Sequence, residues 1–235
     1  MPNNPFEVLI ASFKGVSRTQ VRHLVQEIHA AGGTSPDRLA RMLIEEDLPL
    51  ETRLSICWLL PRLPVPETIR LLIKQLECAE ESMRAEAALG LGLSLKAKDD
   101  ISSLLKLLAT ETSEDVLSAI LHALGIIGSP VSAAPIMQML RSFSSAKIRS
   151  EAAEALAHVH GSGVVDELIN ALRDPSPLAR YSSAYSLGQQ GDRRAIPALR
   201  HLINVDFGAT MWGSVSQAAH EAIRTIIIQT EESVE

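Results

Sequence analysis

Histidine, cysteine and carboxylate side chains are the residues of this chain that could bind a metal or take part in catalysis. Their spacing decides whether they form such a site. The 235-residue sequence has seven histidines but neither an HExxH nor a CxxC pattern. A metal site needs several converging ligands and an ordered outer shell of hydrogen bonds. The chain offers one His-Glu pair, His220 and Glu221. We therefore expect no bound metal or cofactor, and a half-buried His220.

The two cysteines, Cys57 and Cys78, are not spaced for metal binding or for redox chemistry. Neither has a histidine beside it in sequence, and no nucleophile elbow occurs, so nucleophilic catalysis has no signature. Cys57 falls on an apolar helix position, where a free cysteine packs as a small hydrophobic residue. We expect reduced thiols, a reducing compartment and no catalytic residue.

Four arginines recur at regular intervals and offer a different chemistry, the binding of anions. They are Arg53, Arg84, Arg149 and Arg180. A row of guanidinium groups could form an anion-binding stripe, but repetition favours a structural role, in which each arginine pairs with acids and carbonyls of a turn. Asp174 precedes Arg180 by six residues, and Asp47 precedes Arg53 by the same distance. We therefore predict that these arginines and Asp174 are structural.

The arginines mark a repeated helix that must position every candidate site. With Leu117 in place of one arginine, the successive spacings are 31, 33, 32 and 31 residues. If the arginine is position zero, positions three, four, seven and eight are apolar or small, which defines one face of a helix. A small residue at position eight, as at Gly125 and Gly188, lets another helix approach closely.

A second helix pattern alternates with the first. Its members are residues 67–76, 100–108, 133–140, 164–172 and 195–203. Short amphipathic helices are marginal alone, so each pair must stack on its neighbours. We predict a single domain over 1–235, with degenerate N-terminal repeats at 1–65, regular repeats at 66–203, and an insertion loop and capping helix at 204–235. Helices are also expected at 17–33, 35–46 and 216–228.

Composition narrows the function classes. The net charge is −6, which disfavours nucleic acid because phosphate binding needs a basic face. No apolar run is long enough to cross a membrane, and the first residues do not resemble a signal peptide. We expect a soluble, cytoplasmic protein.

The repeats resemble HEAT repeats, in particular the short HEAT-like repeats of the phycobilisome-lyase type. The matching segments are RAEAALGLG (84–92), RSEAAEALAHV (149–159), LRDPSPLAR (172–180), RYSSAYSLGQQGD (180–192) and AIPALRHL (195–202). The resemblance implies an all-α, right-handed α-solenoid of about seven antiparallel helix pairs, with the arginine-led helices on its concave side. The family that the repeats resemble includes protein scaffolds, bilin-handling lyase subunits and an iron-dependent hydroxylase that uses a His-Glu pair in several repeats.

The concave surface is the first candidate binding site. If positions three, four, seven and eight face the core, positions two, five, six and nine face away from it. The residues expected there are Trp58, Leu59, Leu89, Leu93, His122, Ile126, Glu151, Glu154, His158, Tyr185 and Gln189. An apolar patch edged by polar groups is typical of an interaction site. Glu151, Glu154 and His158 favour a basic partner segment, with pH sensitivity near neutrality through His158.

The insertion at 204–215 is the second candidate. It holds Phe207, Met211 and Trp212 in a chain that is only 3% aromatic. These side chains form either a binding loop on a rigid scaffold or a cover for the apolar end of the last repeat.

These patterns predict a non-catalytic scaffold or adaptor that binds a protein or peptide partner on its concave face. The resemblance leaves two alternatives: a chromophore-handling, phycobilin-lyase-like subunit, for which a bilin would be the ligand, and a HEAT-like iron-dependent hydroxylase. The single His-Glu pair argues against the hydroxylase.

Overall fold

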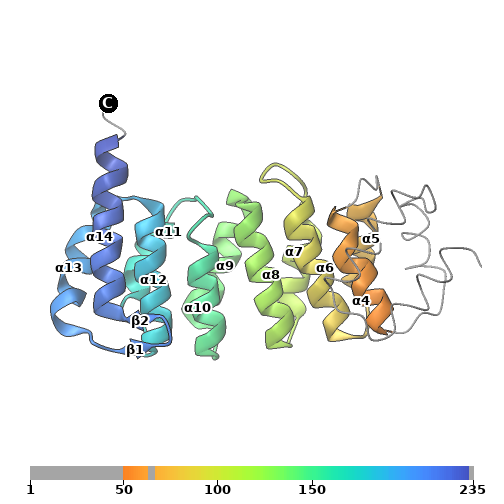
Figure 1. The fold of residues 1–235 in the computed structure, drawn as a ribbon, viewed down its shortest axis with the longest axis horizontal. Helices are drawn as coiled ribbons and strands as arrows, with labels where there is room; N and C mark the ends of the chain where they lie inside the picture. Colours follow the sequence, from red (N-terminus) through yellow and green to blue (C-terminus); the bar gives the residue numbers. More distant parts are fainter. Residues whose placement is uncertain (1–49, 63–66, 233–235) are drawn as a thin grey trace, which may run out of the picture. The chain divides into compact units, whose positions relative to one another are not determined.

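The computed structural model describes residues 50–62 and 67–232. The regular secondary structure of this part of the chain is helical apart from one two-stranded sheet (Figure 1). Contacts divide the chain into two compact units, which meet in sequence at Leu95 and Lys96. The helices predicted at 17–33 and 35–46, and Asp47, lie outside the described residues. The single domain over 1–235 stays a prediction.

The first unit contains three described helices and a short turn of 3₁₀ helix. They are α4 (Leu50–Leu59), η1 (Leu60–Arg62), α5 (Thr68–Gln75) and α6 (Glu81–Ser94). Both α4 and α5 pack against α6. Leu60, Leu72, Met83 and Leu91 are fully buried between them and form the core of this unit.

The second unit contains the remaining helices and the sheet. They are α7 (Ser102–Thr110), α8 (Glu114–Ile127), η2 (Pro130–Ser132), α9 (Ala133–Ser142), α10 (Ala146–Ala155), α11 (Val164–Ala171), α12 (Pro177–Gln190), η3 (Arg193–Ala195), α13 (Ile196–Val205), β1 (Ala209–Thr210), β2 (Gly213–Ser214) and α14 (Val215–Glu232). The five helices of the second sequence pattern begin and end within two residues of the predicted bounds, so this prediction is confirmed.

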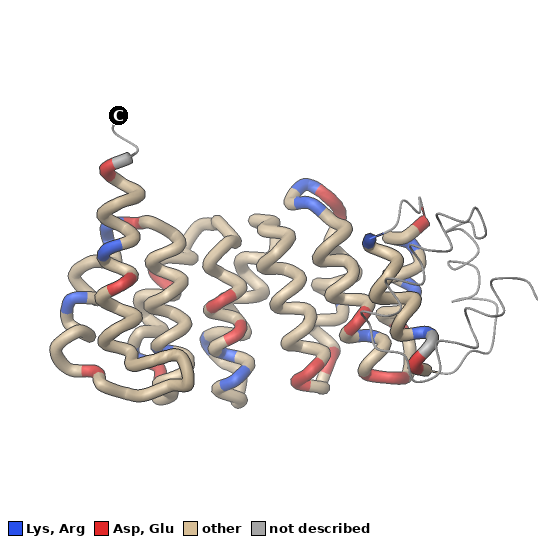
Figure 2. Tube along the Cα trace, viewed as in Figure 1, with Lys and Arg blue, Asp and Glu red and all other residues tan. Residues whose placement is uncertain are grey.

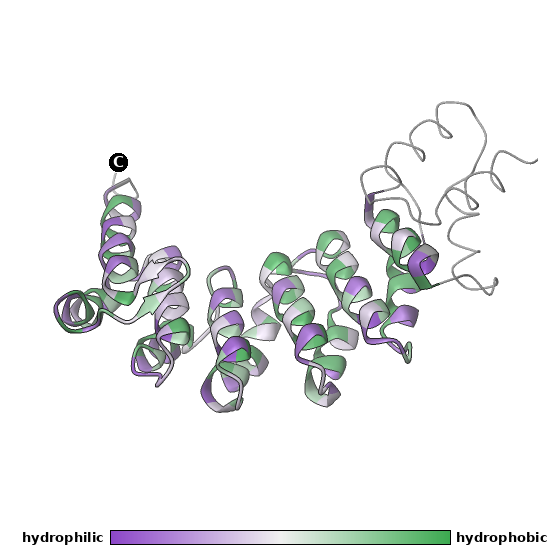
Figure 3. Cartoon of the chain, turned by 60° about the horizontal axis from the view of Figure 1, so that its bottom comes forward, coloured by the Kyte–Doolittle hydropathy of each residue, from purple (hydrophilic) through white to green (hydrophobic). Residues whose placement is uncertain are grey.

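The helices of the second unit form two layers. In one layer α10 packs between α8 and α12, and α12 packs against α14 (Figure 1). In the other layer α9 packs against α11, and α9, α11 and α13 each pack against their partner in the first layer. Every helix carries both polar and apolar residues (Figure 3), as an amphipathic helix between solvent and core requires. Leu104, Leu117, Ile120 and Leu121 are fully buried in this unit.

Glycine at position eight sets the distance between helices of the same layer. A Cβ atom at Gly125 of α8 would lie 3.1 Å from Ala155 Cα, and one at Gly188 of α12 would lie 2.9 Å from Ala222 Cα. A Cβ atom at Gly188 would force a shift of the backbone, and one at Gly125 would make a contact tighter than almost all real Cβ contacts, so glycine suits this approach. The predicted role of the small residue at position eight is therefore confirmed at both sites.

The turns follow local side-chain chemistry. Gly128 and Gly191 have φ values of 67° and 70°, and these left-handed residues end α8 and α12. Asp174 Oδ1 accepts a hydrogen bond of 2.8 Å from the Ser176 backbone N–H, which shapes the turn into α12. Helix α10 ends early at Ala155, so His158 lies in the turn that follows the helix.

Candidate protein-binding surface

The exposed side of the layer α8, α10, α12 and α14 is the candidate binding surface. It is made by positions five and nine of the four helices, counted from the repeated arginine or its equivalent. These residues, called the candidate face below, are His122, Ile126, Glu154, His158, Tyr185, Gln189, Glu221 and Thr225. All are exposed or half-exposed, and Ile126 and Tyr185 have 48% and 46% of their surface in solvent. The structure thus brings together the predicted residues that belong to the second unit.

Positions two and six were also predicted to face solvent, and for most helices this is wrong. Position six is buried in every helix of the layer, at Ala123, Ala155, Ser186 and Ala222. Position two is buried except at Glu151, which is half-buried. The reason is that each helix packs against its neighbours in the same layer, and these positions lie in the contact. On α8, α10 and α12 the exposed strip is therefore narrow, whereas α14, the last helix of the layer, also exposes His220 and Arg224.

The first unit carries its own exposed apolar residues. Leu93 has 46% of its surface in solvent, and Trp58 and Leu89 are half-buried. The Arg62 guanidinium carbon lies 4.0 Å from the centre of the Trp58 ring, a cation–π contact. Leu59 is 3% exposed and belongs to the core, so its prediction as a surface residue is wrong for the same reason as the other position-six residues.

Acidic side chains dominate the charge of the candidate face. Figure 2 shows acidic residues along α10 and α14. Glu154 accepts a hydrogen bond of 2.7 Å from the Ser182 hydroxyl, which also pairs with Ser150 at 2.7 Å. Burial raises the pKa of Glu151, whose Oε2 atom has no hydrogen-bond partner among the described residues. In the described part of the chain, none of Glu151, Glu154 and Glu221 forms an ion pair.

A small pocket opens between α12 and α14 at one end of the candidate face. Its volume is about 140 Å³. It is lined by Tyr181, Tyr185, Gly188, Gln189, Ala218, Glu221, Ala222 and Thr225. Burial raises the pKa of Tyr181, and the negative charges of Glu221 and Glu154 act in the same direction. The pocket therefore combines two aromatic rings with a negative potential.

The insertion forms a β-hairpin that was not predicted. Strands β1 and β2 pair antiparallel, with Ala209 opposite Ser214 and Thr210 opposite Gly213, and β1 packs against α12. Phe207, Met211 and Trp212 are 71%, 87% and 55% exposed. Side chains this exposed are better suited to a binding loop than to a cover for the end of the last repeat. The Trp212 ring lies 6.0 Å from the Tyr181 ring, so the hairpin extends the aromatic wall of the pocket.

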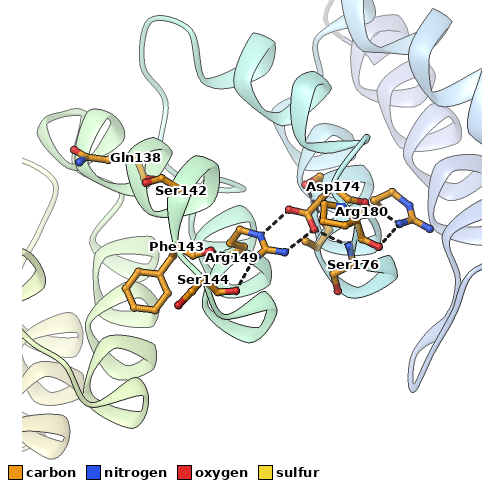
Figure 4. A network of polar contacts seen from close by, with 11 residues as sticks. Gln138, Ser142, Phe143, Ser144, Arg149, Asp174, Ser176 and Arg180 are labelled. Atoms are coloured by element: carbon orange, nitrogen blue, oxygen red, sulfur yellow. Dashed lines mark hydrogen bonds and ion pairs between the residues drawn. The ribbon is translucent and has the colours of Figure 1, made fainter.

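The repeated arginines of the second unit, Arg149 and Arg180, bind the preceding turn and an acidic residue of the next repeat. Arg149 donates hydrogen bonds of 2.9 Å to the carbonyl oxygens of Phe143 and Ser144, six and five residues earlier. Its Nε and Nη2 atoms donate to the Asp174 carboxylate of the next repeat, at 2.7 and 2.9 Å (Figure 4). The Arg149 and Asp174 side chains are 12% and 9% exposed, so this is a largely buried, bidentate pair.

Arg180 repeats the arrangement one step later. It donates to the carbonyl oxygens of Asp174 and Pro175 at 2.8 and 3.1 Å, and to both oxygens of Asp206 at 2.5 and 3.0 Å. Asp174 thus accepts a hydrogen bond from Arg180 at its backbone carbonyl and two from Arg149 at its carboxylate (Figure 4). The hydrogen bond from Arg180 holds the pKa of Asp206 below its ordinary value, despite partial burial.

The first unit shows the same carbonyl contacts. Arg84 donates to the carbonyl oxygens of Cys78 and Ala79 at 2.9 and 2.8 Å. Arg53 donates to Glu80 at 3.1 Å and to the Cys78 sulfur at 3.3 Å. An arginine in the first turn of a helix that binds the preceding turn is therefore found in both units, at Arg84 in the first and at Arg149 and Arg180 in the second.

Comparison with known proteins identifies the family to which this repeat belongs. The family model for HEAT repeats matches residues 37–125, 69–157 and 133–211. The chain belongs to the HEAT-repeat family. The predicted all-α solenoid of HEAT-like helix pairs is thereby confirmed, and the described residues hold α4 and the five pairs that follow it. No curated protein shows significant sequence similarity to this HEAT-repeat chain.

Solved structures share the fold at low sequence identity. The chain is 19% identical to a structure of the complex of CpcE and CpcF of phycocyanin lyase from Nostoc sp., with a TM-score of 0.50 and coverage of 94% of each chain. It is 18% identical to a designed armadillo repeat protein in complex with the peptide (KR)4, with a TM-score of 0.56 and coverage of 82% of this chain and 100% of that one. At these identities the similarity shows the fold alone.

The cysteine and histidine side chains that the sequence singled out, Cys57 and His220, are either packed in the core or exposed to solvent. Cys57 is buried, and burial raises the pKa of its thiol strongly. His220 is exposed, so its prediction as a half-buried residue is wrong. No group of three or more His, Cys, Asp or Glu residues converges to hold a metal within residues 50–62 and 67–232. Over the same residues, no helix has the length and apolar character needed to span a membrane.

Sequence reasoning missed four residues that matter here. Tyr181 and Glu221 line the pocket, Asp206 pairs with Arg180, and Gln190 supports the turn after α10. The Gln190 amide donates to the carbonyl oxygens of Leu156 and Val159 at 2.5 and 3.1 Å. Spacing carries a signal for Asp206, because it follows Arg180 by 26 residues, as Asp174 follows Arg149 by 25.

Proposed function

We propose that this HEAT-repeat protein is a scaffold that binds a partner protein through the candidate face, and that the bound segment of the partner is basic. The observation that carries the proposal is the composition of that face. Its exposed positions hold Ile126, Tyr185 and carboxylates that form no ion pair among the described residues. A monomer that only needed solubility would place charged residues of both signs there, rather than Ile126, Tyr185 and acidic residues alone.

The side chains of the candidate face are of types that gain free energy when a partner covers them. Tyr185 presents a large ring at small conformational cost, which is why tyrosine is common among residues that dominate binding. Glu154 and Glu221 flank it on the neighbouring helices α10 and α14. A basic segment would neutralise these charges and steer the partner to this surface.

The fold neighbours give this reading a precedent. A designed armadillo repeat protein with a similar fold was solved in complex with the peptide (KR)4, a basic peptide. That complex supports the idea that stacked helix pairs can present a surface to such a segment. The chromophore-handling and hydroxylase alternatives stay predictions. The pocket of the candidate face, at about 140 Å³, is smaller than the roughly 300–1,000 Å³ typical of cofactor sites.

The test is capture of partners from an extract of the organism that carries this sequence, followed by titration of each captured protein with purified parent and variant chains. The variant is Tyr185→Ala with Glu154→Gln, and the matched control is Gln138→Ala with Asn170→Ala on the exposed side of α9 and α11. We expect the first pair to weaken binding at least about tenfold and the control pair to leave it unchanged. Equal loss in both variants, or loss in the control alone, would contradict the proposal.

A further inference from the structure

The floor of the pocket between α12 and α14 is made of small residues, Gly188 and Ala222, which contribute mainly backbone atoms. Gly188 lies against Ala222 so closely that a Cβ atom would come within 2.9 Å of Ala222 Cα. Tyr181 and Tyr185 form one wall, and Glu221 forms part of the opposite wall. The small floor residues leave a depression in which the walls supply all the polar and aromatic chemistry.

The size of the pocket defines the kind of occupant. Sites for whole small molecules usually have volumes of about 300–1,000 Å³. At about 140 Å³, this pocket suits one side chain of a larger partner. A partner segment lying on the candidate face would have such a side chain within reach.

The charge of the pocket defines the chemistry of that side chain. No basic residue lines the pocket, and Arg224 on the next turn of α14 does not reach it. Glu221 makes no ion pair with any described residue, and Glu154 stands on the adjacent helix α10. Carboxylates and tyrosine ring faces both attract cations, so the pocket favours a cationic side chain and disfavours an acidic one.

We propose that this pocket recognises an arginine side chain of the partner, with its guanidinium group stacked on Tyr185 and hydrogen-bonded to Glu221. The inference rests on the proposed function and names the residue that the candidate face selects. Arginine is favoured over lysine because its planar group stacks on aromatic rings and offers two parallel donors to one carboxylate. Lysine is a compact charge that does neither.

The experiment is an NMR titration of the ¹⁵N-labelled protein with three probes: N-acetyl-arginine amide, N-acetyl-lysine amide and N-acetyl-citrulline amide. Citrulline keeps the shape of arginine without its charge. The arginine probe should shift the backbone amide signals of Gly188, Ala222 and Tyr185 saturably. Its dissociation constant should be at least about fivefold lower than that of lysine and about tenfold lower than that of citrulline.

Glu221→Gln should weaken the arginine probe about tenfold, whereas Glu231→Gln, on an exposed part of the same helix, should not. Unchanged amide signals elsewhere show that each variant is folded. Equal binding of arginine and citrulline, or of arginine to parent and Glu221→Gln, overturns the inference. If the natural partner still needs Tyr185 and Glu154 in those cases, the proposed function survives and only the arginine pocket is wrong.

Discussion

At the scale of single residues, Asp174 shows how one side chain can link two repeats. Its carboxylate accepts two hydrogen bonds from Arg149, and its backbone carbonyl accepts one from Arg180. Burial would raise the pKa of Asp174, but the hydrogen bonds from Arg149 and Ser176 outweigh this and hold it below its ordinary value. A charge that is buried and fully paired stabilises its neighbours only while both partners remain.

We therefore expect Arg149→Ala to destabilise the protein. The Asp174 carboxylate would lose its bidentate partner while remaining largely buried, which typically costs about 3–5 kcal/mol. Lys147→Ala is the matched control on the same helix, because its ion pair with Asp115 is exposed and is worth less than about 1 kcal/mol. Chemical denaturation monitored by circular dichroism measures both. An Arg149→Ala variant as stable as Lys147→Ala, but defective in partner binding, would make the arginine series a ligand site.

Glu151 shows the opposite case, a half-buried carboxylate that makes no ion pair in the described part of the chain. Because its folded pKa is raised, the ionised form costs stability. That cost is absent below the unfolded value of about 4.3 and appears as the pH rises through the folded pKa. Glu151→Gln should therefore raise the melting temperature at pH 7, and this gain should vanish below about pH 4. A lower melting temperature at pH 7 would show that the charge is stabilising.

At the scale of elements, the hairpin and the helix layers were predictable to different degrees. The helices follow from periodicity, since apolar residues at positions three, four and seven can only be buried by stacking pairs. Exposure did not follow, because a helical wheel shows which way Leu59 or Ala123 points but not that a neighbouring helix covers it. The hairpin escaped prediction because Gly213, with φ of 131°, and two-residue strands give no periodic signal.

The hairpin yields a prediction of its own. Phe207 and Met211 are largely in solvent, so Phe207→Ser with Met211→Ser should change the free energy of unfolding by no more than about 0.5 kcal/mol. Asp206 stays intact in this variant, so the Arg180 pair is preserved. If the hairpin belongs to the recognition surface, partner binding falls while stability holds. A clear loss of stability in thermal denaturation would revive the capping role.

At the scale of the whole molecule, sequence established the family and the repeat, but the site depended on the structure. Tyr185, Glu154 and His158 were predicted from helix geometry and do lie on one surface of the second unit. Tyr181 and Glu221 were not, because their importance depends on how closely α12 approaches α14, which Gly188 and Ala222 permit. The net charge of −6 fits a protein that attracts basic partners, whose association should slow as salt screens the charges.

The central claim is that the partner binds the layer α8, α10, α12 and α14 rather than the layer α9 and α11. Site-specific photo-crosslinking tests it most directly, with a photoreactive residue placed singly at His158, Gln189, Gln138 or Asn170. The first two positions belong to the candidate face, and the other two are exposed on the opposite layer. Crosslinks to the captured partner from positions 158 and 189, and none from 138 and 170, are the predicted result. Crosslinks from 138 and 170 alone would contradict the account.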